Sequence, residues 1–153
     1  MNYPVRHETG TAPSAAEDGE IAAQVAGLCF RRSAGGKREV LLITSRDTGR
    51  WIIPKGWTMS GMSNAAAACE EAWEEAGVVD AAVKSRPLGA YHYPKVLDDG
   101  SIRPCRVEVF RIRVGKLAKS YPEARERKRI WVSPGKAAKL VDEPELKAIL
   151  RDF

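Results

Sequence analysis

The apolar and polar positions along the chain predict a sheet of several strands joined by short turns. Continuous apolar runs at 21–30 and 39–45 lie on either side of a glycine-containing turn, which is the pattern of a hairpin. Asp98, Asp99 and Gly100 are a second turn signal and predict another hairpin. The other expected elements are strands at 51–53, within 81–93, at 90–96, at 103–114 and at 129–132, and a turn at 54–57.

Residues 64–76 have the pattern of a helix with one face of small side chains. Asn64 is a suitable N-cap, the alanine run after it has high helix propensity, and Gly77 stands where a glycine ends a helix. At about 100° per residue, the small side chains share one face of the helix. They are Ala65, Ala68, Cys69, Ala72 and Ala76. Such a face lets a helix pack closely on a sheet.

The opposite face of this helix carries Glu71, Glu74 and Glu75, with Glu70 at its margin. Like charges at helical spacing repel by roughly 0.2–0.5 kcal/mol per pair, and the C-terminal end of a helix disfavours anions. A bound cation would relieve both costs, and clustered carboxylates without His or Cys suit Mg²⁺ or Mn²⁺. The alternative is a solvated acidic face without a ligand, and the helix alone does not decide between them.

Two more helices are expected at the C-terminal end. Ser133 is a suitable N-cap and Pro134 takes the first position of a helix that ends near 140, and a closing helix follows at 142–150. A chain of 153 residues with 44 % apolar residues fits one domain, expected at 20–153. The mixed polar segment 1–19 is expected to be a flexible N-terminal arm.

The charge of the chain is positive but uneven. The net charge is +5, and residues 81–139 contain 15 Lys and Arg against 5 Asp and Glu. A basic region beside an acidic helix suits a polyanionic substrate that is held through metal on one side and cations on the other. Nucleic-acid binding is the rival, but the basic residues are not interleaved with aromatic ones and no nucleic-acid-binding motif is found.

Compartment and membrane signals are few. No apolar run has the length of a membrane span, and the N-terminus has no apolar signal-peptide core. Cys29, Cys69 and Cys105 are odd in number and widely spaced, which indicates free thiols in a reducing compartment. We therefore expect a cytoplasmic protein that does not engage a membrane.

The stretch from Gly56 to Val78 resembles the Nudix box of pyrophosphohydrolases, G-x5-E-x7-R-E-U-x-E-E-x-G-U, where U is apolar. The matching positions are Gly56, Glu71, Ala72, Glu74, Glu75, Gly77 and Val78. Met62 and Glu70 depart from the pattern, since the family has Glu and Arg there. In the family the Glu and the Arg help to fix the loop and the helix. Losing both should damage the box less than losing one, because neither is left as a buried charge without the other. Residues 51–57 resemble the subgroup of diphosphoinositol polyphosphate and dinucleoside polyphosphate phosphohydrolases.

The resemblance covers most of 21–150 and implies an α/β (α+β) Nudix fold, a mixed sheet between helices. It implies a hydrolase that cleaves a phosphoanhydride bond with Mg²⁺ or Mn²⁺. The residues that it assigns to metal and catalysis are Glu71, Glu74 and Glu75, with the main-chain carbonyl of Gly56 as an added metal ligand. The general base is left open between Glu74 or Glu75 and the later Glu123 or Glu126.

Phosphate contacts must come from cations outside the helix. The candidates are Arg46, Arg50, Lys55 and Arg106, each of which could instead be a surface charge. His92 is similarly open between a structural role and a ligand role.

The substrate is expected to be a nucleoside-diphosphate-linked compound, a dinucleoside polyphosphate or a diphosphoinositol polyphosphate. Ala22 and Gln24 stand near positions where the inositol-polyphosphate subgroup often has basic residues, which counts against the last of these. Because Met62 and Glu70 depart from the box, a catalytically impaired module that binds nucleotides or polyanions is the alternative. The chain is expected to be a monomer or a homodimer.

Overall fold

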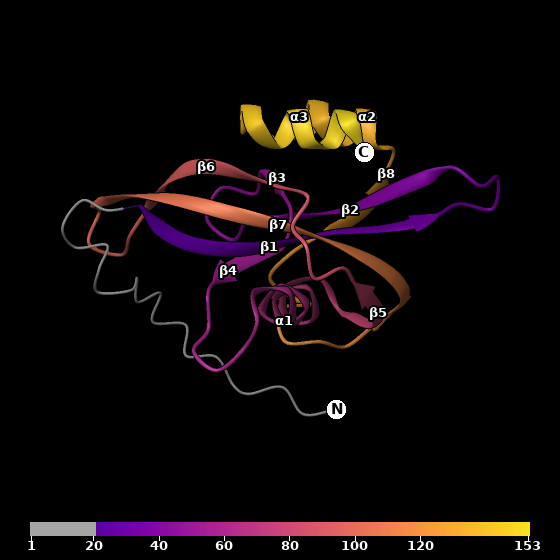
Figure 1. Ribbon diagram of the computed structural model, residues 1–153, viewed down its shortest axis with the longest axis horizontal. Helices are drawn as coiled ribbons and strands as arrows, with labels where there is room; N and C mark the ends of the chain where they lie inside the picture. The colour runs from indigo at the N-terminus through magenta and orange to yellow at the C-terminus, as the bar shows by residue number, and fades with distance from the viewer. Residues whose placement is uncertain (1–20) are drawn as a thin grey trace.

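The computed structural model describes residues 21–153, so the expected N-terminal arm at 1–19 lies outside the described residues. Within them, eight strands form one mixed sheet, with α1 on one face and α2 and α3 on the other (Figure 1). The strands are β1 (Ala22–Arg32), β2 (Arg38–Thr44), β3 (Trp51–Ile52), β4 (Lys55–Trp57), β5 (Val78–Val83), β6 (Gly89–Val96), β7 (Ile102–Leu117) and β8 (Arg129–Val132). The helices are α1 (Asn64–Ala76), α2 (Pro134–Leu140) and α3 (Pro144–Asp152). The predicted fold class is confirmed.

The first strand lies in the middle of the sheet, whose main order is β3-β2-β1-β7-β5. β1 runs parallel to β7, with partners from Ala22 and Cys105 to Phe30 and Arg113. The other pairings among the described strands are antiparallel. β4 pairs with β1, β6 with β7 and β8 with β2, so short strands extend the sheet at its ends.

Both predicted hairpins are present. β1 and β2 pair with Phe30 opposite Val40, and β6 and β7 pair with Val96 opposite Ile102. The segment 54–57 was predicted to be a turn, and this is wrong for most of it. Lys55–Trp57 is instead the strand β4, because its backbone finds a partner in β1.

Two apolar cores lie on the two faces of the sheet. One core packs β1, β2 and β7 against α2 and α3, and the other packs the same strands against the small side chains of α1. Ala68, Ala72 and Ala76 are completely buried, as the periodicity predicted. The close approach of α1 brings its carboxylates to the backbone of β4.

The ends of the helices follow local signals, with one correction. The N-cap of α1 is Ser63, whose Oγ accepts a hydrogen bond from the Ala66 N–H at 3.1 Å, and not Asn64 as predicted. Gly77 ends the helix in the left-handed conformation at φ 75°, as predicted. Ser133 and Pro134 begin α2 as predicted.

The described residues also bear on the cysteines and on membranes. All three cysteines are free, with Cys29 and Cys105 buried and Cys69 partly buried. No helix within 21–153 is long and apolar enough to cross a membrane.

Candidate active site

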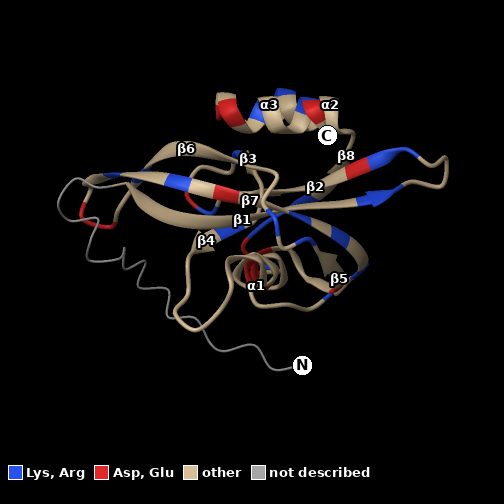
Figure 2. Ribbon diagram, viewed as in Figure 1, with Lys and Arg blue, Asp and Glu red and all other residues tan. Residues whose placement is uncertain are grey.

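The carboxylates of α1 are buried and do not form a solvated face. Glu71 is 2 % exposed, and Glu74 and Glu75 are each 7 % exposed. The alternative of a solvated acidic face is therefore wrong. These side chains lie between β4 on one side and the loop that joins β7 to β8 on the other. Figure 2 shows the acidic colour on α1 next to the basic colour of β4.

The strand β4 holds two of the glutamates through its backbone. A methyl group at Gly56 would overlap the Glu71 carboxyl group, so only glycine lets this carboxylate lie against the strand. The N–H of Lys55 donates a hydrogen bond to Oε1 of Glu75 at 3.2 Å. The Gly-containing strand and the acidic helix thus form one unit.

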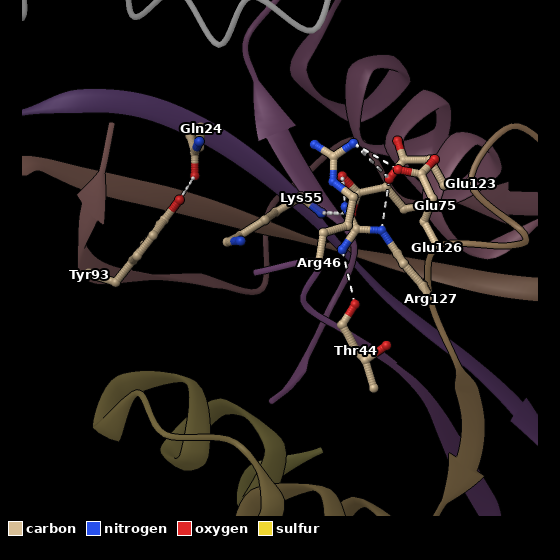
Figure 3. Close-up of polar contacts among 9 residues, drawn as sticks. All are labelled: Gln24, Thr44, Arg46, Lys55, Glu75, Tyr93, Glu123, Glu126 and Arg127. Carbon is tan, nitrogen blue, oxygen red and sulfur yellow. Dashed lines mark hydrogen bonds and ion pairs between the residues drawn. The ribbon is translucent and has the colours of Figure 1, made fainter. Parts of the chain in front are cut away.

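Arg127 joins this unit to the loop between β7 and β8 (Figure 3). Its guanidinium is 3.5 Å from Oε2 of Glu75 and donates to Oε1 of Glu123 at 2.8 Å. It also donates to the carbonyl of Thr44 at 3.0 Å. Because the Arg127 side chain is only 6 % exposed, these contacts are made largely out of water.

Arg46 completes the group on the solvent side. Its guanidinium lies 3.3 Å from Glu126 and 3.9 Å from Glu123. Figure 3 shows the three side chains together. Burial raises the pKa of Glu123 and the charge of Glu75 adds to this effect, while Arg127 and Arg46 oppose it. The structure therefore places Glu123 with the α1 carboxylates, and Glu126 at the exposed rim beside Arg46.

The C-terminal end of α1 is fixed by Arg129. Its guanidinium donates to the carbonyl of Ala76 at 2.7 Å and to that of Ala118 at 2.8 Å. The N–H of Glu123 donates to the carbonyl of Glu74 at 3.0 Å. The bonds to Ala76 and Glu74 satisfy carbonyls in the last turn of the helix and tie that turn to the segment after β7.

Lys55 contributes a side chain on the opposite face of β4. The pKa of its ammonium is lowered to about 8, chiefly by burial; Glu75 opposes this shift and nearby Lys95 adds to it. Its Nζ lies 5.0 Å from the centre of the Tyr93 ring. The hydroxyl of Tyr93 donates to Gln24 at 2.6 Å, which links β6 to β1 on this face.

The remaining predicted cations have other neighbours. Arg50 pairs with Glu143 at 2.8 Å at the start of α3. Arg106 pairs with Glu108 on its own strand at 3.8 Å and is half exposed. The ring of His92 is 3.0 Å from Glu145, which ties β6 to α3 and supports the structural role.

The two departures from the box are both accommodated in the fold. Met62 packs against the apolar core beneath α1. Glu70 is 1 % exposed, so it lies inside the protein and not at the margin of an open face.

The donor set of the site suits a hard divalent metal in kind. Glu71, Glu74 and Glu75 offer carboxylate oxygens from two turns of one helix, and Glu123 offers another from the loop. In the arrangement described here, Arg127 holds Glu75 and Glu123. Within 21–153 no group of three or more His, Cys, Asp or Glu side chains is spaced to hold a metal ion. A metal at these carboxylates would therefore have to compete with Arg127.

Arg127 is the main residue of the site that the sequence analysis did not identify. The signal that could have found it is the charged run from 123 to 129, which comes directly before the strand β8. The sequence of such a run does not indicate which acidic residues each basic residue will contact. Its partners Glu75 and Thr44 are distant in sequence and come together only through the sheet.

Comparisons with known proteins bear on the domain as a whole. A family model described as the NUDIX domain matches residues 22–153. Nudix hydrolase 21, chloroplastic, of Arabidopsis thaliana is 30 % identical over 129 residues, which are 81 % of this chain and 61 % of that protein. Nudix hydrolase 12, mitochondrial, of the same plant is 28 % identical over 120 residues, which are 76 % and 59 %. The chain thus spans about three fifths of the length of these curated relatives.

Solved structures give the same fold. An Ap4A hydrolase of C. elegans superposes with a TM-score of 0.62 at 21 % identity, covering 88 % of this chain and 96 % of that one. The NUDIX domain of Shewanella oneidensis NrtR, complexed with ADP ribose, gives 0.63 at 15 % identity, covering 87 % and 88 %. At these identities the likeness shows the fold alone.

Proposed function

The chain belongs to the Nudix family, and from that premise we propose that it hydrolyses a phosphoanhydride bond with the help of a divalent metal ion. The observation that carries the proposal is the burial of three glutamates of α1 against the Lys55–Trp57 strand. A buried carboxylate is costly unless it pairs with or coordinates a cation, and Gly56 leaves room for the carboxylate of Glu71 beside the strand.

In this proposal Glu71, Glu74 and Glu75 hold the metal, with the carbonyl of Gly56 as an added ligand. When bound, Mg²⁺ or Mn²⁺ would neutralise charge on the phosphates and lower the pKa of a coordinated water. The packing of α1 on the sheet orients the carboxylates in advance. Gly56 keeps β4 close enough for the helix and the strand to act together.

The proton acceptor is proposed among Glu74, Glu75, Glu123 and Glu126. The position of Glu123 favours it over Glu126, because Glu123 is buried beside Glu75 whereas Glu126 faces Arg46 at the rim. Among the proposed phosphate ligands, Arg46 contacts Glu123 and Glu126, and the backbone of Lys55 bonds to Glu75. To bind a phosphate, Arg50 would have to leave or share its partner Glu143, and Arg106 its partner Glu108.

The substrate class stays open among nucleoside-diphosphate-linked compounds, dinucleoside polyphosphates and diphosphoinositol polyphosphates. One similar structure is named an Ap4A hydrolase and another is a domain complexed with ADP ribose, but at 21 % and 15 % identity they do not choose among these classes. A cytoplasmic location remains our expectation for this chain, although the two plant relatives are named mitochondrial and chloroplastic.

A module that binds nucleotides without turning them over is the second candidate. Two observations favour it: Met62 is part of the apolar packing under α1, and Arg127 already holds Glu75. Such a module would bind the same polyanions and leave them intact.

The deciding experiment measures phosphate or nucleotide release from diadenosine polyphosphates, nucleoside diphosphate derivatives and a diphosphoinositol. Each compound is tested with Mg²⁺, with Mn²⁺ and with chelator. Cleavage that requires metal supports the enzyme. Binding without cleavage, by folded protein, supports the module. Salt-sensitive binding of generic nucleic acid that ignores changes at Glu71 or Glu75 would favour the nucleic-acid rival.

We expect Glu75→Gln to lower kcat by about 10²–10⁴-fold, because the variant loses a charge that serves either the metal or the proton transfer. Glu39→Gln is the matched control, since it makes the same change in a surface pair with Arg31. Glu75 is buried beside Arg127, so the variant is also expected to lose some stability, and its folding is checked by circular dichroism. Unchanged kcat in a folded Glu75→Gln protein would refute the assignment.

A further inference from the structure

Four side chains form a layer over the end of the sheet that faces away from α1. They are Lys55 and Trp57 of β4 and Tyr93 and Lys95 of β6, and we call them the lysine–aromatic surface. Residues two apart in a strand point to the same face, so each strand supplies one lysine and one aromatic ring to this layer. All four are partly exposed.

The contacts within this surface are reciprocal. Nζ of Lys55, from β4, lies 5.0 Å from the ring centre of Tyr93, from β6. Nζ of Lys95, from β6, lies 5.8 Å from the ring of Trp57, from β4. Since β1 and β7 separate these two strands, the side chains must reach across the curved sheet. Tyr93 does so visibly in Figure 3, where its hydroxyl meets Gln24 of β1.

The surface gathers positive charge, because each of its two rings lies beside the ammonium group of a lysine from the other strand. An anion placed between the two ammonium groups would offset their mutual repulsion.

The lysine–aromatic surface begins on β4, the strand whose other face contacts the carboxylates of α1. The backbone of Lys55 bonds to Glu75 and the Cα of Gly56 faces Glu71, while the side chains of Lys55 and Trp57 extend over the other face. A ligand whose phosphates are held beside α1 can therefore cross β4 and lay its remaining part on this surface.

We propose that the lysine–aromatic surface determines substrate specificity by binding an aromatic group attached to the diphosphate, as in a nucleoside diphosphate. The ring of the ligand stacks on Trp57 in the place of the Lys95 ammonium, and Lys95 turns to a phosphate. The inference rests on the proposed function. An inositol polyphosphate would use the lysines but gains nothing from the two rings, so the composition of the surface favours a nucleotide.

The test compares two diphosphate probes that cannot be hydrolysed, α,β-methylene-ADP and methylene diphosphonate, by calorimetry with Mg²⁺. We expect Trp57→Leu to weaken binding of the nucleotide probe at least tenfold and to leave the probe without a base unchanged. Trp57→Phe keeps an aromatic face and should restore most of the affinity. Lys95→Met should weaken both probes.

Trp131→Leu is the matched control, because Trp131 also lies under a cation, with Arg31 4.2 Å from its ring, but on another part of the sheet. It should bind both probes like the original protein. If Trp57→Leu does not fold, Trp57→Met takes its place, because it also removes the ring. Equal weakening of both probes by the variant without a ring, or no weakening of the nucleotide probe, overturns the inference.

The two proposals fail separately. If the substrate panel is not cleaved but nucleotide binding depends on Trp57, the hydrolase proposal fails and this inference stands. If the panel is cleaved and Trp57 has no effect on nucleotide affinity, the inference fails alone.

Discussion

At the scale of single residues, Arg127 connects three parts of the site that are distant in sequence. It reaches Glu75 on α1, Glu123 in the loop and the carbonyl of Thr44 at the end of β2. In the absence of another cation, its charge offsets the repulsion between two buried carboxylates. A divalent metal would supply the same compensation, so the guanidinium and a metal are alternative counter-ions for Glu75.

This alternative predicts how Arg127→Met will behave. Without metal, the loss of one partner from a buried ion pair should cost about 3–5 kcal/mol of stability. With saturating Mg²⁺ the cost should be smaller, because the metal compensates the carboxylates that Arg127 leaves. Urea unfolding with chelator and with Mg²⁺ measures both values. Arg113→Met, at an exposed position of β7, is the control, and an equal cost in both conditions would contradict the exchange.

At the scale of elements, the ends of α1 decide where its glutamates lie. The hydroxyl of Ser63 caps the first turn, while Asn64 donates from its side chain to Glu108 at 3.0 Å. We expect Ser63→Ala to cost about 1 kcal/mol, as N-cap replacements do. Asn64→Ala should cost less, since it removes only an exposed hydrogen bond. Urea unfolding measures the loss of stability in both variants. A larger loss for Asn64→Ala would indicate that Asn64, and not Ser63, is the N-cap.

Several elements could be predicted from the sequence because their signals are local. A helix that starts with Ser133 and Pro134 needs only those residues, and the turn at Asp98–Gly100 needs only its own loop. The strand β4 has no such signal, since Lys55 and Gly56 are not typical strand residues. It is a strand because β1 and Glu75 provide partners for its backbone.

The residues of the site likewise divide into those with local sequence signals and those placed by tertiary packing. Helical periodicity brings Glu71, Glu74 and Glu75 together, and this much could be read from spacing. The elements that cover these glutamates could not be predicted, because periodicity describes one face of a helix and not what packs against it. The loop with Glu123 and the strand with Gly56 bury that face. Two ion pairs could not be predicted either. That of Arg50 with Glu143 depends on tertiary packing, and that of Arg106 with Glu108 depends on the rotamers of the two side chains.

At the scale of the whole molecule, the parallel pairing of β1 with β7 joins the two halves of the chain. No local pattern predicts it, because its partners are more than eighty residues apart, as Ala22 and Cys105 are. β1 is thereby enclosed between β2, β4 and β7, with a core on each face. Opening β1 to solvent should require that both cores separate.

Cys29 reports on that opening. Its side chain is completely buried in β1, and burial raises the pKa of the thiol well above its ordinary value, with Cys69 adding to the effect. In a variant that keeps only Cys29, through Cys69→Ser and Cys105→Ser, we expect modification by iodoacetamide only after global unfolding. The rate should then increase with urea by the full slope of equilibrium unfolding. The control keeps only the partly buried Cys69, through Cys29→Ala and Cys105→Ser, and should react through local motion with a weaker dependence on urea. If Cys29 reacts as fast as Cys69 without denaturant, β1 opens locally, and the two cores do not unfold together.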